Sequence, residues 1–351
     1  MKAKEIAVLR GDYIGPEIME AGLQVLQAVT AGKNVHYNLS EYPFGGAGID
    51  QSGEPFPAST KAGVLAADAV LLSAIGGPKW DQATIRPETG LLQLRKTLGV
   101  FANLRPTVVN PALIERSPLK AQIVADTNFL MVRELTSGAY FGEPRRLTQQ
   151  DALDTIYYSR QEIERVMKVG FQLAQTRKQH VTIVDKSNVL ATSKLWRQVA
   201  HEQVAQFPNV TVDDCYVDAM AMNLLSQPNQ FDVIITPNLF GDILSDEAAE
   251  LTGSIGTIPS VSLGKGQRAL YEPIHGSAPD IAGKGIANPF SMINTIALLL
   301  KHTFHRPELA TKIDGALTRT IESGVVTPDL GGSAITTEVT QTVIHNLEGG
   351  A

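Results

Sequence analysis

The chain has 351 residues, with 43% hydrophobic and 19% charged residues and a formal net charge of −6. This composition is typical of a globular protein with a full core, and the length favours two domains over one. The negative charge argues against a nucleic-acid-binding surface, although a local arginine cluster could still bind a small anionic substrate.

The single cysteine, Cys215, rules out a disulfide framework within the chain, and we expect it to be a small core residue. The N-terminal segment MKAKEIAVLRGDYIG has too short an apolar run for a signal peptide. The charge-free stretch 285–300 is too short and too interrupted for a membrane span. The sequence therefore predicts a soluble protein of a reducing compartment, the cytoplasm.

In chain order, short apolar segments alternate with segments of helical period. Expected helices begin at Gly15, with Pro16 in the first turn, and cover residues 160–178 and approximately 192–206. This alternation predicts an α/β fold. The expected strands are residues 5–9, 69–73, 128–134, 181–186, 210–218 and 231–237.

Two aspartates, Asp242 and Asp246, are four residues apart in FGDILSD, a helical pattern that follows the expected strand 231–237. Like charges at this spacing share a helix face and cost roughly 0.2–0.5 kcal/mol on a solvated surface. The segment follows the carboxyl end of a strand, where α/β sheets place ligands, and Asp218 ends another strand-like run. Three carboxylates suit Mg²⁺ or Mn²⁺. Spacing alone leaves a metal site and a solvated helix face both open.

Three arginines, Arg95, Arg105 and Arg133, lie near the ends of expected elements. The guanidinium group binds carboxylates through a rigid fork, so the three together suit a substrate with two carboxylates. Each alone is an ordinary surface arginine, and spacing does not show that they converge.

Tyr140 in GAYFGE and Lys186 in VDKSNV are candidates for acid–base chemistry. Lys186 follows a buried strand, where desolvation makes a lysine easier to deprotonate. Taken alone, the patterns favour an ordinary strand-end lysine and a structural tyrosine.

Residues 272–289, EPIHGSAPDIAGKGIANP, are rich in Gly, Pro and Ala, which predicts an irregular segment whose backbone N–H groups can face an anion. Asp280 is suited to accept hydrogen bonds from a ribose diol. His275 either touches a cofactor or structures this loop. Two glycine patterns, GKGQRA and GKGIAN, resemble a dinucleotide fingerprint, but neither follows a convincing strand within a βαβ unit, so we expect no Rossmann loop at either.

Together these segments resemble the isocitrate/isopropylmalate dehydrogenase family of decarboxylating dehydrogenases, and most closely its isopropylmalate type. The resemblance extends over nearly the whole chain, and the combination of motifs is very specific. The matching segments are GDYIGPEI (11–18), SAIGGPKWD (73–81), RPETGLLQLRK (86–96), FANLRP (101–106), RELTSGAYFGEP (133–144), VDKSNVL (184–190), YVDAMAM (216–222), TPNLFGDILSDEAA (236–249) and HGSAPDIAGKGIANP (275–289).

The resemblance implies a two-lobed α/β fold with a sheet that spans both lobes, different from the Rossmann fold. The first lobe, residues 1–99 and 252–351, would bind the cofactor. The second lobe, residues 100–251, would make the contact of a homodimer and hold the metal and catalytic residues. The active site would be shared between two subunits.

The resemblance also implies roles for single residues. Lys186 would be the base that takes the hydroxyl proton, and Tyr140 the acid that protonates the enolate after CO₂ loss. Asp242, Asp246 and Asp218 of the partner subunit would hold Mg²⁺ or Mn²⁺. The substrate-binding residues would be Glu88, Leu91, Leu92, Arg95, Arg105, Arg133, Val189 and Asp218. The cofactor-binding residues would be Glu272, His275, Gly276, Ser277, Ala278, Pro279, Asp280, Ile281, Ala287 and Asn288.

The implied reaction is the NAD-dependent oxidative decarboxylation of (2R,3S)-3-isopropylmalate to 4-methyl-2-oxopentanoate and CO₂ in leucine biosynthesis. Asp280 followed by Ile281 favours NAD, because a 2′-phosphate would meet like charge there. Leu91 and Leu92 suit an isopropyl group, whereas the third carboxylate of isocitrate would be costly in an apolar pocket.

Three alternatives remain from the sequence. Within the family, the substrate could be isocitrate, homoisocitrate or tartrate. A Mg²⁺-dependent nucleotide-binding or phosphoryl-transfer protein is a second possibility, although the chain contains no Walker A sequence. A non-catalytic binding module is the third.

Overall fold

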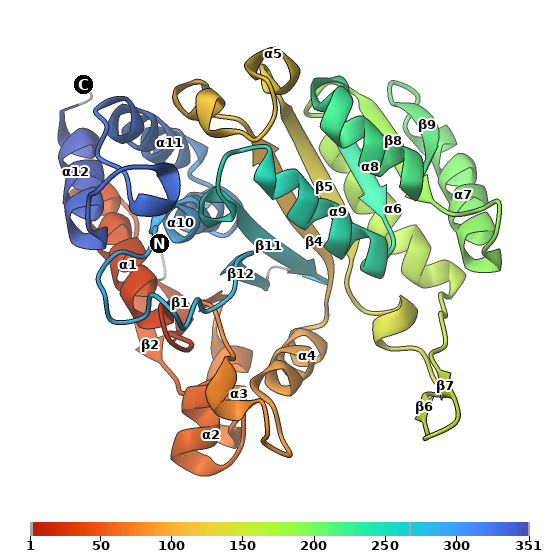
Figure 1. Ribbon diagram of the computed structural model, residues 1–351, viewed down its shortest axis with the longest axis horizontal. Helices are drawn as coiled ribbons and strands as arrows, with labels where there is room; N and C mark the ends of the chain where they lie inside the picture. Colours follow the sequence, from red (N-terminus) through yellow and green to blue (C-terminus); the bar gives the residue numbers. More distant parts are fainter. Residues whose placement is uncertain (1–2, 267, 350–351) are drawn as a thin grey trace. The chain divides into compact units, whose positions relative to one another are not determined.

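The computed structural model describes residues 3–266 and 268–349, in two compact units (Figure 1). The terminal unit comprises Met1–Val100 and Ser254–Ala351, and the central unit comprises Phe101–Gly253. The family resemblance implies boundaries at 99/100 and 251/252. Residues 1–2, 267 and 350–351 of the expected lobes lie outside the described part.

In the terminal unit, the strands follow the order β2-β1-β3-β12-β11. The pairs β1–β2, β1–β3 and β3–β12 are parallel, whereas β11 and β12 are antiparallel. The strands are β1 (Lys4–Leu9), β2 (Tyr37–Glu41), β3 (Ala69–Leu72), β11 (Pro259–Gly264) and β12 (Ala269–Pro273). The helices are α1 (Gly15–Thr30), α2 (Gly46–Ser52), α3 (Ala58–Ala66), α4 (Pro87–Leu98), α10 (Phe290–His302), α11 (Pro307–Glu322) and α12 (Thr336–Glu348).

Helix α1 forms where the sequence predicts it. Pro16 occupies the first turn, where its missing N–H has no intrahelical acceptor to lose, and Glu17 lies near the positive end of the helix dipole. The apolar residues Ile18, Val25 and Leu26 recur at helical spacing and are fully buried. Helix α1 packs against α10 and α12, so this apolar stripe becomes part of the core (Figure 1).

In the central unit, the strands follow the order β4-β5-β10-β8-β9. The pair β4–β5 is antiparallel, and the pairs β5–β10, β10–β8 and β8–β9 are parallel. The strands are β4 (Val100–Val108), β5 (Asn128–Glu134), β8 (His180–Asp185), β9 (Thr211–Tyr216) and β10 (Val233–Thr236), with a separate short pair β6 (Arg146–Leu147) and β7 (Ala152–Leu153). The helices are α5 (Ala121–Val124), α6 (Arg160–Ala174), α7 (Ala191–Gln203), α8 (Val217–Ser226) and α9 (Asn238–Glu250).

The two faces of the central sheet are covered by different helices, as the alternation of side chains along β10 shows. Ile234 belongs to a buried cluster with Leu224 of α8 and Leu244 of α9. The next residue, Ile235, points to the opposite face, because a Cβ atom added to Gly170 of α6 would lie 2.3 Å from its Cδ1. A parallel strand buried on both faces explains the continuous apolar run of β10. The expected α/β class is therefore confirmed.

Two details of the expected elements are wrong. Strand β9 ends at Tyr216, and Asp218 lies in the first turn of α8. The segment VDAMAMNLLS is rich in Ala, Met and Leu, which favour a helix, and an acidic residue is stabilised near the helix N-terminus. In the segment 272–289, which was expected to be irregular, Glu272 and Pro273 belong to β12.

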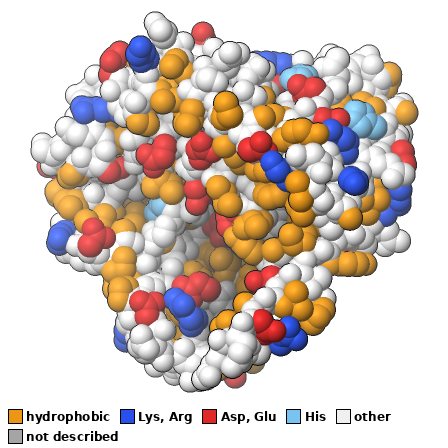
Figure 2. All heavy atoms as spheres, turned by 45° about the vertical axis from the view of Figure 1, so that its right-hand side comes forward, with side chains coloured by type: hydrophobic (Ala, Val, Ile, Leu, Met, Phe, Trp, Pro, Cys, Tyr) orange, Lys and Arg blue, Asp and Glu red, His pale blue; other side chains and the backbone are white. Residues whose placement is uncertain are grey.

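The pattern GKGQRA lies around the antiparallel β11–β12 hairpin, and its Gln267 falls outside the described residues. This connection is no βαβ crossover, which agrees with the rejection of a Rossmann loop there. Among the helices of the described residues, none is long and apolar enough to cross a membrane. Figure 2 shows Lys and Arg side chains interspersed with Asp and Glu on the face that it presents, so no field of one sign covers this face.

Candidate active site

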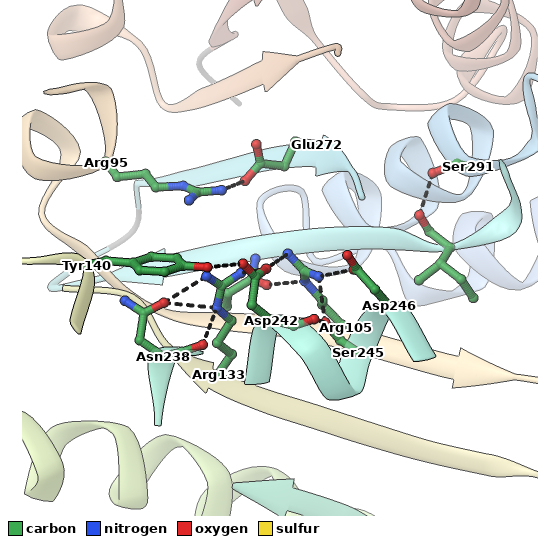
Figure 3. Close-up of polar contacts among 12 residues, drawn as sticks. Arg95, Arg105, Arg133, Tyr140, Asn238, Asp242, Ser245, Asp246, Glu272 and Ser291 are labelled. Carbon is green, nitrogen blue, oxygen red and sulfur yellow. Dashed lines mark hydrogen bonds and ion pairs between the residues drawn. The ribbon is translucent and has the colours of Figure 1, made fainter. Parts of the chain in front are cut away.

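Asp242 and Asp246 lie on α9, the helix that begins directly after β10, and two arginines from neighbouring strands reach them (Figure 3). Arg105 of β4 places Nη1 3.1 Å from Asp246 Oδ1 and Nη2 3.7 Å from Asp242 Oδ1. Arg133 of β5 bonds Asp242 Oδ1 through its Nη1. The like charges on this helix face are tolerated because two guanidinium groups compensate them. Arg105 and Arg133 therefore converge, which their spacing in the sequence did not show.

The charges of this cluster differ in their access to solvent. The side chains of Arg133 and Arg105 are 2% and 8% exposed, whereas those of Asp242 and Asp246 are 31% and 56% exposed. Burial raises the pKa of the Asp246 carboxyl, while Arg105 opposes this shift. The arginines form the floor of the cluster, and the carboxylates remain open to a ligand.

Close packing brings α9 against the two strands that carry the arginines. A Cβ atom on Gly241 would lie 2.7 Å from Arg133 Cγ and 2.8 Å from Thr236 Cγ2, so only glycine allows this approach. Ser245 of α9 also accepts a 2.6 Å hydrogen bond from Arg105 Nη1. Both contacts fix the helix relative to the guanidinium groups.

Tyr140 adds a phenol to the cluster. It ends the short 3₁₀ turn Gly138–Tyr140, and its hydroxyl donates a hydrogen bond to Asp242 Oδ2. The guanidinium carbon of Arg133 lies 5.6 Å from the centre of its ring. Burial, and next the bond to Asp242, raise the pKa of the Tyr140 phenol, so it is protonated at neutral pH and able to donate.

Lys186 and Asp218 form a pair of their own. Lys186 follows β8 and bonds Asp218 through its ammonium group, and its Nζ lies 5.9 Å from the centre of the Tyr216 ring. The hydrogen bond from Lys186 lowers the pKa of the exposed Asp218 carboxyl. Val189 lies in the turn after Lys186 and is 67% exposed.

In the described part of a single chain, no group of three or more His, Cys, Asp or Glu side chains could hold a metal ion. Asp218 therefore does not join Asp242 and Asp246 within one subunit. The donor set of α9 still fits a hard divalent cation, since it consists of carboxylate oxygens with partly open faces. Such a site needs further oxygen ligands from a substrate, water or another chain.

In the terminal unit, the expected substrate residues share one face of α4. Glu88, Leu91, Leu92 and Arg95 occupy positions i, i+3, i+4 and i+7 of this helix. Leu92 is 37% exposed. Arg95 Nη2 donates a 3.0 Å hydrogen bond to Glu272 Oε1 at the end of β12, so a predicted substrate residue contacts a predicted cofactor residue.

The predicted cofactor segment is anchored at several points within the terminal unit. Ser277 is buried and its hydroxyl donates a 2.7 Å hydrogen bond to the Gly76 carbonyl. The Ala287 backbone N–H bonds Glu17 Oε1 at 3.2 Å, and the Asn288 amide donates to Asp329 Oδ2 at 2.8 Å. These anchors make the irregular segment a defined loop.

Between the anchors, the loop exposes several of the predicted residues. Gly276, Pro279 and Asp280 are exposed, and Ile281 is half-buried beside Asp280. Ala278 adopts a φ of +41°, an uncommon conformation for a residue with a side chain. His275 bonds the Gly276 carbonyl through Nδ1, and its Nε2 is buried without a hydrogen-bond partner among the described residues.

Sequence reasoning missed two residues of the central cluster, Asn238 and Ser245. Asn238 is fully buried at the first position of α9 and accepts hydrogen bonds from Arg133. The available signal was a small polar residue at the start of a helix that follows a buried strand. That signal normally indicates a helix cap, and it does not reveal which side chain the amide contacts.

Comparison with known sequences shows similarity over the full length. The isocitrate/isopropylmalate dehydrogenase family matches residues 5–345. A relative named 3-isopropylmalate dehydrogenase from Listeria monocytogenes (strain EGD-e) is 52% identical, with 99% of each chain covered. One of the same name from Staphylococcus saprophyticus is 49% identical, with 98% of this chain and 99% of the relative covered.

Solved structures agree with this grouping. The crystal structure of isocitrate dehydrogenase from Methylococcus capsulatus superposes with a TM-score of 0.87 at 32% identity, with 98% of this chain and 99% of that chain covered. A β-decarboxylating dehydrogenase from Thermococcus kodakarensis gives a TM-score of 0.82 at 35% identity, with 98% and 96% covered.

Proposed function

Because the chain belongs to the isocitrate/isopropylmalate dehydrogenase family, we propose that it catalyses the NAD-dependent oxidative decarboxylation of (2R,3S)-3-isopropylmalate to 4-methyl-2-oxopentanoate and CO₂. This reaction would serve leucine biosynthesis in the cytoplasm. The observation that carries the proposal is the cluster of Arg105, Arg133, Tyr140 and the two aspartates of α9, which combines carboxylate binding with a protonated acid.

The choice of substrate rests on the exposed face of α4 and on the relatives. Leu91 and Leu92 lie one helical turn before Arg95. An apolar group of a ligand would therefore contact the leucines while a neighbouring carboxylate of the same ligand contacts Arg95. A third carboxylate of a substrate would lie beside the two leucines. It would lose hydrating water there, and the leucines offer it no cationic partner. Two relatives that are 52% and 49% identical to this chain are named 3-isopropylmalate dehydrogenase.

Asp242 and Asp246, with Asp218 of the partner subunit, would hold Mg²⁺ or Mn²⁺. Such an ion, when bound, supplies Lewis acidity to the oxygens of the substrate. Arg105 and Arg133 would bind substrate carboxylates through their forks, and Arg95 is a further candidate for the same role. Because these guanidinium groups are already held by protein partners, they would meet the substrate with little loss of side-chain entropy.

The proton transfers fall to Lys186 and Tyr140. Lys186, as a neutral amine, would take the proton of the substrate hydroxyl. NAD, when bound, would supply the acceptor for the hydride from the carbon that bears this hydroxyl, which gives a β-keto acid. The bond to the departing CO₂ then breaks, and Tyr140 would protonate the resulting enolate carbon. Lys186 contacts Asp218 in its own chain, so both would enter a neighbouring subunit's site together.

Two further features support a homodimer and NAD as the cofactor. Met222 of α8 and Ile243 of α9 are 71% and 60% exposed on helices that pack against each other, as expected for a face that a second copy covers in a homodimer. The exposed carboxylate of Asp280, followed by Ile281, suits a ribose diol and repels a 2′-phosphate, which favours NAD over NADP.

A substrate and cofactor panel tests the proposal. The absorbance of NADH or NADPH at about 340 nm would be followed with 3-isopropylmalate, isocitrate, homoisocitrate and tartrate, each with and without EDTA. We expect the highest kcat/KM for 3-isopropylmalate with NAD, and its loss in EDTA. A preference for isocitrate would contradict the assignment of Leu91 and Leu92, and undiminished turnover in EDTA would contradict the metal site.

A further inference from the structure

Asn238 is fully buried, and both its side chain and its backbone make polar contacts within the central unit; those with Arg133 are drawn in Figure 3. Its Oδ1 accepts hydrogen bonds from Arg133 Nε at 3.1 Å and Nη2 at 2.7 Å, and its backbone carbonyl accepts one from Nε at 3.0 Å. Its Nδ2 donates to the Ser137 carbonyl at 3.1 Å. Its backbone N–H donates to the Tyr158 hydroxyl at 2.9 Å.

These contacts join three parts of the cluster that are distant in sequence. Arg133 is the last residue but one of β5, Ser137 directly precedes the turn that carries Tyr140, and Asn238 begins the helix that carries Asp242. Asn238 therefore bonds both the arginine and the tyrosine loop, and each of these in turn bonds Asp242.

A primary amide of this size meets both demands. The side chain accepts from a guanidinium group through one atom and donates to a carbonyl through another, whereas an ionised carboxylate only accepts and an aliphatic isostere does neither. Because Asn238 has no exposed surface, water does not replace either partner. The polar contacts of Asn238, and not only its position at the start of a helix, therefore favour an amide side chain.

We propose that Asn238 is a positioning residue for the reaction, which sets the guanidinium plane of Arg133 and the loop of Tyr140 against the helix of Asp242. The inference rests on the proposed function for the roles of Arg133 and Tyr140. Asn238 itself does not touch the substrate. Its contribution is geometric, and misplacement of reacting groups by about 1 Å costs on the order of 10²-fold in rate.

The test compares Asn238→Ala and Asn238→Asp with a matched control, Asn294→Ala. Asn294 of α10 in the terminal unit also donates an amide hydrogen bond to a carbonyl, at 2.9 Å to Thr257, but lies outside the cluster. For Asn238→Ala we expect kcat/KM for 3-isopropylmalate to fall about 10²-fold, with KM for NAD within about twofold of wild type. The control should keep both values within about threefold.

The Asn238→Asp variant separates the contact with Arg133 from the contact with the Ser137 carbonyl. It also tests the proposal if the alanine variant fails to fold. The carboxylate still accepts from Arg133 but cannot donate to the Ser137 carbonyl. We therefore expect kcat to fall about tenfold or more while KM for 3-isopropylmalate stays within about threefold. A purely structural role would instead lower only the fraction of active enzyme, so that kcat per titrated active site and KM for both ligands would match wild type in every variant.

A measurement that does not depend on turnover uses nitrogen-15 arginine spectra of the full protein. In wild type, the Nη2–H resonances of Arg133, identified by their loss in Arg133→Lys, should exchange slowly because Nη2 bonds Asn238 Oδ1. They should remain in Asn238→Asp and vanish or shift in Asn238→Ala, whereas the Nε–H keeps the backbone carbonyl of residue 238 as an acceptor. An unchanged resonance in folded Asn238→Ala, wild-type kcat/KM in that variant, or an equal loss in Asn294→Ala would overturn the inference. If wild type does not oxidise 3-isopropylmalate, the proposed function fails while this spectrum still decides the role of Asn238.

Discussion

Replacement of Arg133 with methionine removes the guanidinium group at the centre of the candidate site. The side chain is 2% exposed and bonds both Asp242 and Asn238. Methionine fills much of the same volume without a charge. The variant therefore leaves Asp242 with the more distant Arg105, at 3.7 Å, and the Tyr140 hydroxyl, and it leaves the buried amide oxygen of Asn238 without the donors of Arg133.

The expected cost follows from these two contacts. A buried acceptor without a partner costs about 1–3 kcal/mol, and the loss of one partner of a buried ion pair costs about 3–5 kcal/mol. Since the Asp242 side chain is 31% exposed, water screens part of its charge, and we expect a total loss of about 3 kcal/mol in the free energy of unfolding. The further change Asp242→Asn should recover about 1 kcal/mol of this, because it removes a carboxylate charge that has lost its nearer guanidinium partner.

Urea unfolding of wild type and variants at equal protein concentration measures these differences. Arg116→Met is the matched control, since Arg116 lies exposed in the same unit, and it should change stability by at most about 0.5 kcal/mol. If Arg133→Met costs less than about 1 kcal/mol, or no more than the control, the ion-pair network does not stabilise the unit as argued.

Three further predictions concern the aspartates, the base and a distant histidine. Asp242→Asn should abolish metal-dependent turnover and leave the circular dichroism spectrum unchanged; wild-type rates would remove the metal argument. Lys186→Ala should lose kcat far more than NAD affinity, and mixed dimers with Asp242→Asn should regain activity, whereas no recovery would contradict a shared site. Burial, then repulsion by Lys301 and His305, lowers the pKa of His302 from 6.5 to about 4, so wild-type stability should fall as pH drops from 6.5 to about 4, by up to about 3 kcal/mol. His302→Gln should lack this loss in urea unfolding, and an equal pH dependence in both proteins would exclude His302 as the cause.

The sequence predicts the elements best where one period dominates. The run NFLMVRE matches β5 at both ends, because its centre, FLMV, is the continuous apolar segment that a strand buried on both faces requires. Strand β9 shows the limit, since apolar residues continue from Cys215 and Tyr216 into VDAMAM and give no sign of where the helix begins. There the helix propensity of Ala and Met prevails.

The candidate site is predicted only in part, for a physical reason. The i,i+4 spacing of Asp242 and Asp246 is local, so a shared helix face follows from the sequence. The approach of Arg105 and Arg133 depends on strand pairing and on the close contact at Gly241, which are not local. Asn238 was missed because its partners are set by the same tertiary packing.

The most direct test of the account is a crystal grown with Mn²⁺ and 3-isopropylmalate, with anomalous scattering used to locate the ion. The account predicts one strong peak per active site, at about 2.1 Å from oxygens of Asp242, Asp246 and Asp218 of the partner subunit. A peak away from α9, or full occupancy of substrate with no ion near these carboxylates, would contradict it.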